Sequence, residues 1–129
     1  MENKVIKRYK EFTFRMASIE DAKDIIELFE RNYKKPMGPT ESYNHFNWEY
    51  INNPISKLYI LLAISDKNYV AAQYALLPKF LSIFGKKEVC TLSQDTVTDE
   101  GYRGKGLFAS LASKLYDIVK SDKVLFTYG

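Results

Sequence analysis

One stretch of the sequence decides the fold, because it carries a strand into a helix through a glycine-bearing turn: Thr96-Val97-Thr98-Asp99-Glu100-Gly101-Tyr102-Arg103-Gly104-Lys105-Gly106-Leu107-Phe108. Residues 88–98 before the turn have the pattern of a strand. After the turn, apolar residues from Leu107 to Val119 recur on one face at helical spacing, which predicts a helix that ends near residues 121 and 122.

The turn has the features of a phosphate-binding site. The first backbone N–H groups of a helix have no partner within the helix and carry the positive end of its dipole, so they attract anions. Gly104 and Gly106 lack the Cβ atoms that hinder a close approach, while Arg103 and Lys105 add positive charge. The plainer alternative is a tight strand-to-helix turn without a ligand. Ala109 replaces the third glycine of a dinucleotide-binding loop and the P-loop pattern is absent, which disfavours ATP, GTP and dinucleotides.

The segments around this stretch predict an α/β (α+β) chain with a mixed, mostly antiparallel sheet flanked by helices. A first strand is expected at residues 12–16, followed by a helix that Ser18 and Asp21 cap and that runs to about Asn32. Prolines end that helix, and Ser42 is expected to cap a second, shorter one. The strands expected next are 58–64, 69–77, 80–84 and 88–98 as an antiparallel meander, and 124–129 as a parallel neighbour of 88–98.

Length and composition favour one domain and exclude several classes of protein. The chain has 129 residues, of which 46% are hydrophobic and 27% charged, and this suits a folded domain. The formal net charge of +3 is too small to indicate a nucleic-acid partner. The single cysteine, Cys90, excludes an internal disulfide and fits a cytoplasmic location. With one distant histidine, His45, and no apolar run long enough for a membrane span, we predict neither a metal nor a membrane partner.

Two motifs resemble those of the GNAT acyltransferases, a family that transfers an acetyl group from acetyl-CoA to an amine. Residues 103–108, RGKGLF, resemble the family's pyrophosphate motif Q/R-x-x-G-x-G/A, with Phe108 where the family has glycine or alanine. Glu100 stands where a proline usually precedes that motif. Residues 46–54, FNWEYINNP, are similar to the W-x-Y-x-x-N-P helix end of one subgroup of the family. The order of the expected elements also agrees with this family from about Phe12 onward.

The resemblance implies a binding site for acetyl-CoA as cosubstrate, without a metal. In the family, the strand before the motif separates from its parallel neighbour and pairs its exposed backbone with the pantetheine arm. The residues in that place are Thr96, Val97 and Thr98, where a backbone N–H would polarise the thioester carbonyl. Main-chain amides of the motif hold the pyrophosphate, and the residues in its place are Arg103, Gly104, Lys105, Gly106, Leu107 and Phe108.

The catalytic groups are less evident than the cofactor site. If Thr96 and Thr98 face the core, Asp95 and Val97 face the other way, toward the cofactor. Asp95 is therefore the candidate general base and Gln94 a candidate substrate contact. The alternative is that Asp95 is a strand carboxylate with ordinary hydrogen-bond partners. No residue is assigned as the general acid.

A complete domain of the resembled family continues after its fifth strand with a helix and further strands. We therefore expect residues 1–129 to be a single GNAT-like domain that is truncated after the fifth strand. A fragment is the favoured explanation, and a homodimer through the open sheet edge is another. The expected activity is N-acetyl transfer to a small-molecule or peptide amine. The alternatives are a GNAT-like CoA-binding or interaction module without catalysis and an unrelated α/β binding domain, since a fold does not determine a substrate.

Overall fold

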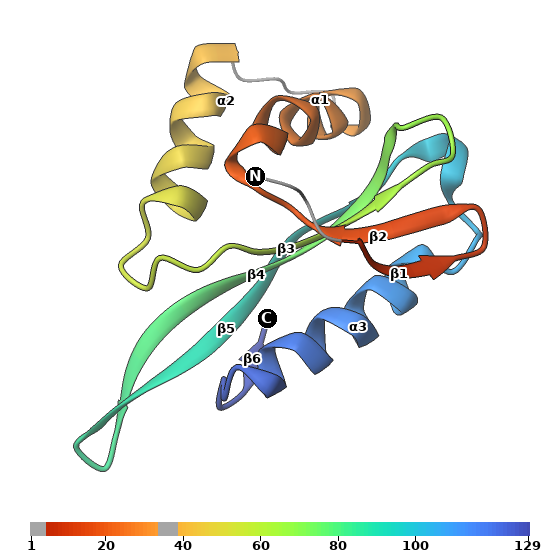
Figure 1. The fold of residues 1–129 in the computed structure, drawn as a ribbon. Coiled ribbons are helices and arrows are strands. Elements are labelled where there is room, and N and C mark those ends of the chain that lie inside the picture. Colours follow the sequence, from red (N-terminus) through yellow and green to blue (C-terminus); the bar gives the residue numbers. More distant parts are fainter. Residues whose placement is uncertain (1–4, 34–38) are drawn as a thin grey trace.

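The computed structural model of the chain describes residues 5–33 and 39–129, which build one sheet with helices on both faces (Figure 1). Six strands lie in the sheet in chain order, and only the last pair is parallel. In Figure 1, α1 and α2 lie over one face and α3 crosses the other. This confirms the predicted mixed, mostly antiparallel sheet. The elements are β1 (Val5–Tyr9), β2 (Phe12–Met16), η1 (Ile19–Asp21), α1 (Ala22–Asn32), α2 (Pro39–Phe46), η2 (Asn47–Ile51), β3 (Tyr59–Ile64), β4 (Val70–Ile83), β5 (Lys86–Thr98), η3 (Glu100–Tyr102), α3 (Leu107–Ser121) and β6 (Thr127–Tyr128).

The prediction that the first strand begins at residue 12 is wrong, because β1 precedes it and pairs with it as a hairpin. β2 itself has the predicted bounds, and its Phe12 and Phe14 are fully buried. β1 has the sequence VIKRY, whose two basic residues hide the alternation that marks a strand with one buried face. A charged edge strand of this kind protects the sheet from pairing with other chains.

The first helix starts with the predicted capping arrangement. The backbone N–H of Ser18 donates to Asp21 Oδ2 at 2.8 Å, and Arg15 donates two further hydrogen bonds to the same carboxylate, at 2.8 and 2.9 Å. The second helix differs from the prediction, since α2 begins at Pro39 and not at Ser42. Proline is tolerated in the first turn of a helix, because the N–H that it lacks would have no partner there.

β4 and β5 form a long hairpin that extends past the rest of the sheet (Figure 1). The two strands predicted on either side of Pro78 are one continuous strand, β4. The last β4 residue that pairs with β3 is Leu76, so β4 is an edge strand at Pro78, where proline is tolerated. The hairpin turns at Phe84 and Gly85, which both have positive φ as a two-residue turn requires.

Apolar side chains form a separate core on each face of the sheet. Cys90 is a free, buried cysteine. Burial of a large aliphatic or aromatic side chain contributes about 2 kcal/mol, so both helical layers are firmly attached. The core under α3 includes Phe12, Phe14, Leu61, Leu76, Leu107, Leu111 and Leu115, and the core under α1 and α2 includes Ile25, Leu28, Phe46, Tyr50, Ile60, Leu62 and Val97.

The last strand is shorter than predicted but has the predicted direction. β6 pairs in parallel with β5 at Thr91 and Leu92, and the backbone N–H of Leu125 donates to the Val89 carbonyl just before it. Pairing of two copies at this edge stays a prediction. Within the described residues, no helix is both long and apolar enough to cross a membrane.

Candidate functional site

A β-bulge interrupts β5 next to the predicted cofactor residues. Gln73 and Ala75 of β4 are two residues apart, but their partners Val97 and Gln94 are three apart, so β5 holds one extra residue. Asp95 lies in this bulge with φ +52°. The bulge turns two successive side chains, Gln94 and Asp95, to the face under α1 and α2, where both meet the same hydroxyl. Its effect is to concentrate polar groups at one point of an otherwise apolar face.

That shared hydroxyl belongs to Tyr50 of η2. Tyr50 donates to Asp95 Oδ2 at 2.5 Å and accepts from Gln94 Nε2 at 3.1 Å. Burial, followed by the charge of Asp95, raises the pKa of Tyr50, so its hydroxyl keeps its proton and remains a donor. Gln73 Nε2 donates to the Asp95 backbone carbonyl at 2.6 Å and fixes the bulge from the neighbouring strand.

A cleft of about 370 Å³ lies where β5 leads into the glycine turn. Val97 is buried under α1, on the same face as Asp95, whereas Thr96 and Thr98 are only half-buried. Thr96 and Thr98 therefore do not meet the condition, facing the core, under which Asp95 and Val97 were expected to face the cofactor. The cleft brings together eight of the nine predicted cofactor residues, with Tyr33 and Tyr102 beside them: Thr96, Val97, Thr98, Arg103, Gly104, Gly106, Leu107 and Phe108.

Lys105 is the predicted cofactor residue that does not line the cleft. Its carbonyl accepts hydrogen bonds from the Tyr9 hydroxyl and from Lys10 Nζ, both at 3.2 Å, and its Nζ lies 3.8 Å from a carboxylate oxygen of Glu11. The β1–β2 hairpin therefore contacts the glycine turn and supports it through Lys105. Lys105 supports the turn and does not add its charge to the cleft.

The backbone of the turn fits a phosphate group. Gly106 is the N-cap of α3 and has φ +78°, and a Cβ there would lie 2.8 Å from the Tyr9 hydroxyl. Gly104 has φ +80°, and a Cβ there would have no atom within 4 Å. Open space therefore lies beside a helix start whose first N–H groups lack helical partners. Phe108, which is 58% exposed, packs its ring against Tyr74 and forms one side of the cleft.

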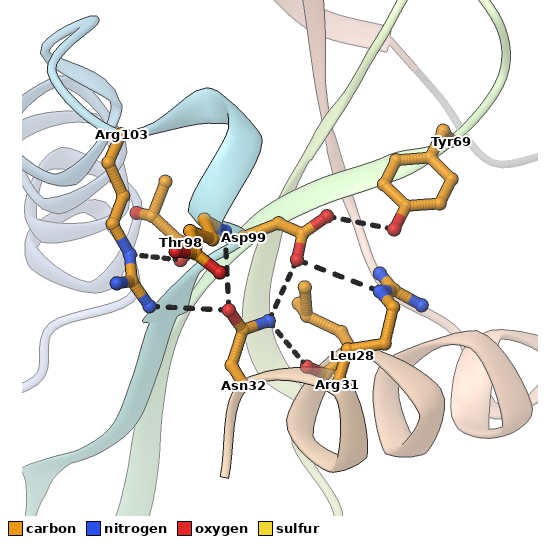
Figure 2. A network of polar contacts seen from close by, with 8 residues as sticks. Leu28, Arg31, Asn32, Tyr69, Thr98, Asp99 and Arg103 are labelled. Carbon is orange, nitrogen blue, oxygen red and sulfur yellow. Dashed lines mark hydrogen bonds and ion pairs between the residues drawn. The ribbon is translucent and has the colours of Figure 1, made fainter.

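Asn32, at the last residue of α1, connects this helix to the turn (Figure 2). Its Oδ1 accepts hydrogen bonds from the Glu100 backbone N–H and from Arg103, both at 3.2 Å. Arg103 Nε in turn donates to the Thr98 carbonyl at 3.0 Å. The Arg103 guanidinium therefore braces the junction between strand and turn, and backbone amides remain the principal groups available to a phosphate.

Asp99 ties the same junction to the end of α1 and to Tyr69, the residue before β4 (Figure 2). Its carboxylate accepts from Asn32 Nδ2 at 2.9 Å and from the Tyr69 hydroxyl at 2.8 Å, and it lies 3.6 Å from Arg31. Burial alone would raise the pKa of Asp99, but the hydrogen bonds from Asn32 and Tyr69 and the charge of Arg31 lower it overall. The carboxylate is thus ionised and holds β5 in place beneath the turn.

A second cavity, of about 240 Å³, lies between α1, α2 and the bulge. We call it the α1–α2 cavity. Tyr33 lines both this cavity and the cleft, so the two adjoin. It is lined by Ile25, Ile26, Phe29, Glu30, Tyr33, Ser42, His45, Phe46, Glu49, Tyr50, Gln73 and Asp95.

Glu49 is a carboxyl group of the α1–α2 cavity whose pKa is shifted by its surroundings. Burial and the neighbouring charge of Asp95 raise the pKa of Glu49, while His45 and Gln94 act in the opposite direction. His45 Nε2 lies 3.8 Å from Glu49.

The sequence prediction included Asp95 and Gln94 but missed Glu49, Tyr50 and Gln73. The missing signal lies in the second helix, where one face carries residues at helical spacing that all reach the α1–α2 cavity. Trp48 lies off this face and is 69% exposed. The residues on the face are Ser42, His45, Phe46, Glu49 and Tyr50.

Comparison with known proteins agrees with this geometry. A family model described as an acetyltransferase (GNAT) domain matches residues 13–129. No curated protein matches the chain. Three solved structures share the fold, each covering 92% of this chain: an acetyltransferase from Trypanosoma brucei (17% identity, 82% of that chain, TM-score 0.69), glucosamine-6-phosphate N-acetyltransferase from Arabidopsis thaliana (19%, 81%, 0.69), and a predicted acetyltransferase with acetyl-CoA from Clostridium acetobutylicum (17%, 80%, 0.70). The family match extends over the sheet from β2 onward, the cleft and the glycine turn, and the chain belongs to the GNAT acetyltransferase family.

Proposed function

We propose that the chain transfers the acetyl group of acetyl-CoA to an amine. The observation that carries this proposal is the contact between two cavities of different character at the bulge of β5. Asp95 lines the α1–α2 cavity, while the next residue, Thr96, lines the cleft that ends at the glycine turn. A donor in the cleft and an acceptor in the α1–α2 cavity would therefore meet at adjacent residues of one strand.

The cleft would hold the cosubstrate mainly through main-chain groups. Thr96, Val97 and Thr98 would pair with the pantetheine arm, and the first amides of α3 would bind the pyrophosphate beside Gly104. Acetyl-CoA supplies an activated thioester acyl group. A backbone N–H of the 96–98 segment would stabilise negative charge on the thioester oxygen. The lining residues fit this role because the turn leaves open space at Gly104.

The carboxylate pair in the α1–α2 cavity would take the proton that the amine must lose. Asp95 is held by Tyr50, and the pKa of Glu49 beside it is raised, which is the direction that favours a carboxylate as a general base. The sequence predicted Asp95 alone as the general base, and the proposal now includes Glu49 as a second carboxylate. Gln94 would orient the pair through Tyr50.

A pair of matched glycine variants tests the cosubstrate site. Gly104 and Gly85 both have φ near +80° and no atom within 4 Å of an added Cβ, but only Gly104 lies at the cleft. Gly104→Trp should weaken acetyl-CoA binding, measured by calorimetry, because the indole ring would fill the place of the pyrophosphate. The expected loss of affinity is about a hundredfold, which corresponds to two charge-assisted hydrogen bonds. Gly85→Trp carries the same backbone strain and should bind normally. Equal affinities in both variants would refute the site, whereas binding without acetylation of any amine would favour the non-catalytic module.

A further inference from the structure

The walls of the α1–α2 cavity are mainly apolar and aromatic. Ile25 and Ile26 of α1 and Phe46 of α2 line it. The rings of Phe29 and Tyr33, which also line it, stack with their centroids 5.5 Å apart. The volume of about 240 Å³ lies just below the usual range for ligand pockets, about 300–1,000 Å³. A space of this size suits a body of about a single ring.

The charged side chains of the cavity are predominantly acidic. Glu30, Glu49 and Asp95 line it, whereas none of its described lining residues is a lysine or an arginine. His45 is the remaining titratable group near Glu49 that could offset these carboxylates. A cationic amine would therefore be attracted, while a phosphate or carboxylate on the acceptor would be repelled.

Gln73 provides an independent sign that the cavity is built for a hydrogen-bond donor. It is 1% exposed and lines the cavity, and its Nε2 is used by the Asp95 backbone carbonyl. Its Oε1 accepts no hydrogen bond from any residue in the described part of the chain. A buried acceptor without a partner is costly, and an ammonium or amine N–H can satisfy it.

We propose that the α1–α2 cavity is the acceptor site, an inference that rests on the proposed function. The acceptor would be a molecule with one amine and an apolar body of about one ring, such as an arylalkylamine. The amine would lie between Glu49, Asp95 and Gln73, with the ring against Ile26 and Phe29. A polyamine would have to remove water from a second cation beside this mainly apolar wall, which is unfavourable. An amino sugar phosphate would place its phosphate near the carboxylates.

Binding to the full chain in the absence of acetyl-CoA gives the first test. Isothermal titration should show that 2-phenylethylamine binds at least tenfold more tightly than 2-phenylethanol, which lacks the amine, and than ethylamine, which lacks the ring. It should also bind more tightly than spermidine and galactosamine 1-phosphate. Equal binding of the alcohol, or tighter binding of either polar amine, would overturn the proposal.

Two variants and two controls give the second test. Glu49→Gln should weaken 2-phenylethylamine binding about tenfold, and Ile26→Ser should weaken it through the ring. The controls Glu27→Gln and Lys23→Ser lie on the exposed side of α1 and should bind normally. An unchanged affinity in both Glu49→Gln and Ile26→Ser would overturn the proposal. If the amine binds as described but the chain binds no acetyl-CoA, the proposed function fails and the amine site stands, so the two failures are distinguishable.

Discussion

The glycine turn and the α1–α2 cavity adjoin, but they are built in different ways. The turn consists of consecutive residues at the end of β5, and its proposed ligand contacts are backbone groups. The cavity combines side chains from α1, α2, η2, β4 and β5, which are far apart in the sequence. A site made of backbone therefore depends on a local motif, whereas a site made of side chains depends on how helices and strands pack.

The two regions also differ in what stabilises them. The turn is fixed by polar contacts, from Asn32 on one side and Tyr9 on the other. The cavity is shaped mainly by apolar packing between the helices and the sheet, and its polar contacts at the bulge centre on Asp95 and Tyr50. Because α1 contributes to both regions, a change at its start should disturb both, and changes at its end or at the bulge should disturb only one.

The largest effect is expected from Asp21→Asn, which acts on both regions. Asp21 is 5% exposed and accepts two hydrogen bonds from Arg15, and a buried ion pair that loses one partner costs about 3 kcal/mol. Urea unfolding at neutral pH should show this loss. Asp24→Asn, an exposed change in the first turn of the same helix, should cost under about 1 kcal/mol. Equal losses in the two variants would contradict the role of the pair.

Acid unfolding sharpens the same prediction. Burial acts to raise the pKa of Asp21, but the hydrogen bonds and charge of Arg15 lower it overall. A carboxyl group with a lowered pKa stabilises the fold above its unfolded value of about 3.9, and this contribution disappears as the pH falls through the folded value. The wild type should therefore lose stability relative to Asp21→Asn below about pH 4, and the difference between them should shrink. A constant difference across this range would contradict the assignment.

A smaller and more selective effect is expected from Asn32→Ala. The change removes the hydrogen bonds to Asp99, the Glu100 N–H and Arg103, which should cost about 1 to 2 kcal/mol of unfolding free energy. Because Arg103 and the turn then lose their support, acetyl-CoA affinity should fall while 2-phenylethylamine affinity stays unchanged. Asn44→Ala, at an exposed position of α2, is the control. The opposite result, in which Asn32→Ala binds acetyl-CoA normally but no longer binds 2-phenylethylamine, would contradict the role of Asn32 as a support of the turn.

The same contrast explains what the sequence could predict. Residues 103–108 form a contiguous motif, and its family resemblance, together with the strand before it, led to the proposal of eight residues that line the cleft. Local spacing also predicted α1 and α3, and the helical crossover between β5 and β6 predicted the parallel direction of β6. These features depend on hydrogen bonds and periodicities within a short segment.

Features that depend on long-range packing were missed. The bulge at Asp95 arises from the register of β5 against β4, which no local pattern displays. Glu49 and Tyr50 become site residues only when η2 packs over that bulge. Lys105 was assigned to the cleft because its place in the motif was clear, but its contacts with Tyr9, Lys10 and Glu11 turn it toward the β1–β2 hairpin. β1 is recognised as a strand only from its pairing with β2, because its sequence lacks a clear alternation of apolar and polar residues.

The smallest effect is expected from Asp95→Asn, which changes one charge in the cavity and leaves the turn intact. In the wild type, burial and the charge of Asp95 raise the pKa of Glu49, while His45 and Gln94 oppose them. Removal of the Asp95 charge should therefore lower the pKa of Glu49, so that Glu49 is ionised at lower pH. The acid limb of the kcat/KM profile should move to lower pH, with acetyl-CoA affinity unchanged. Complete loss of acetyl transfer at every pH would instead identify Asp95 alone as the base, because then the remaining carboxylate of the pair cannot replace it.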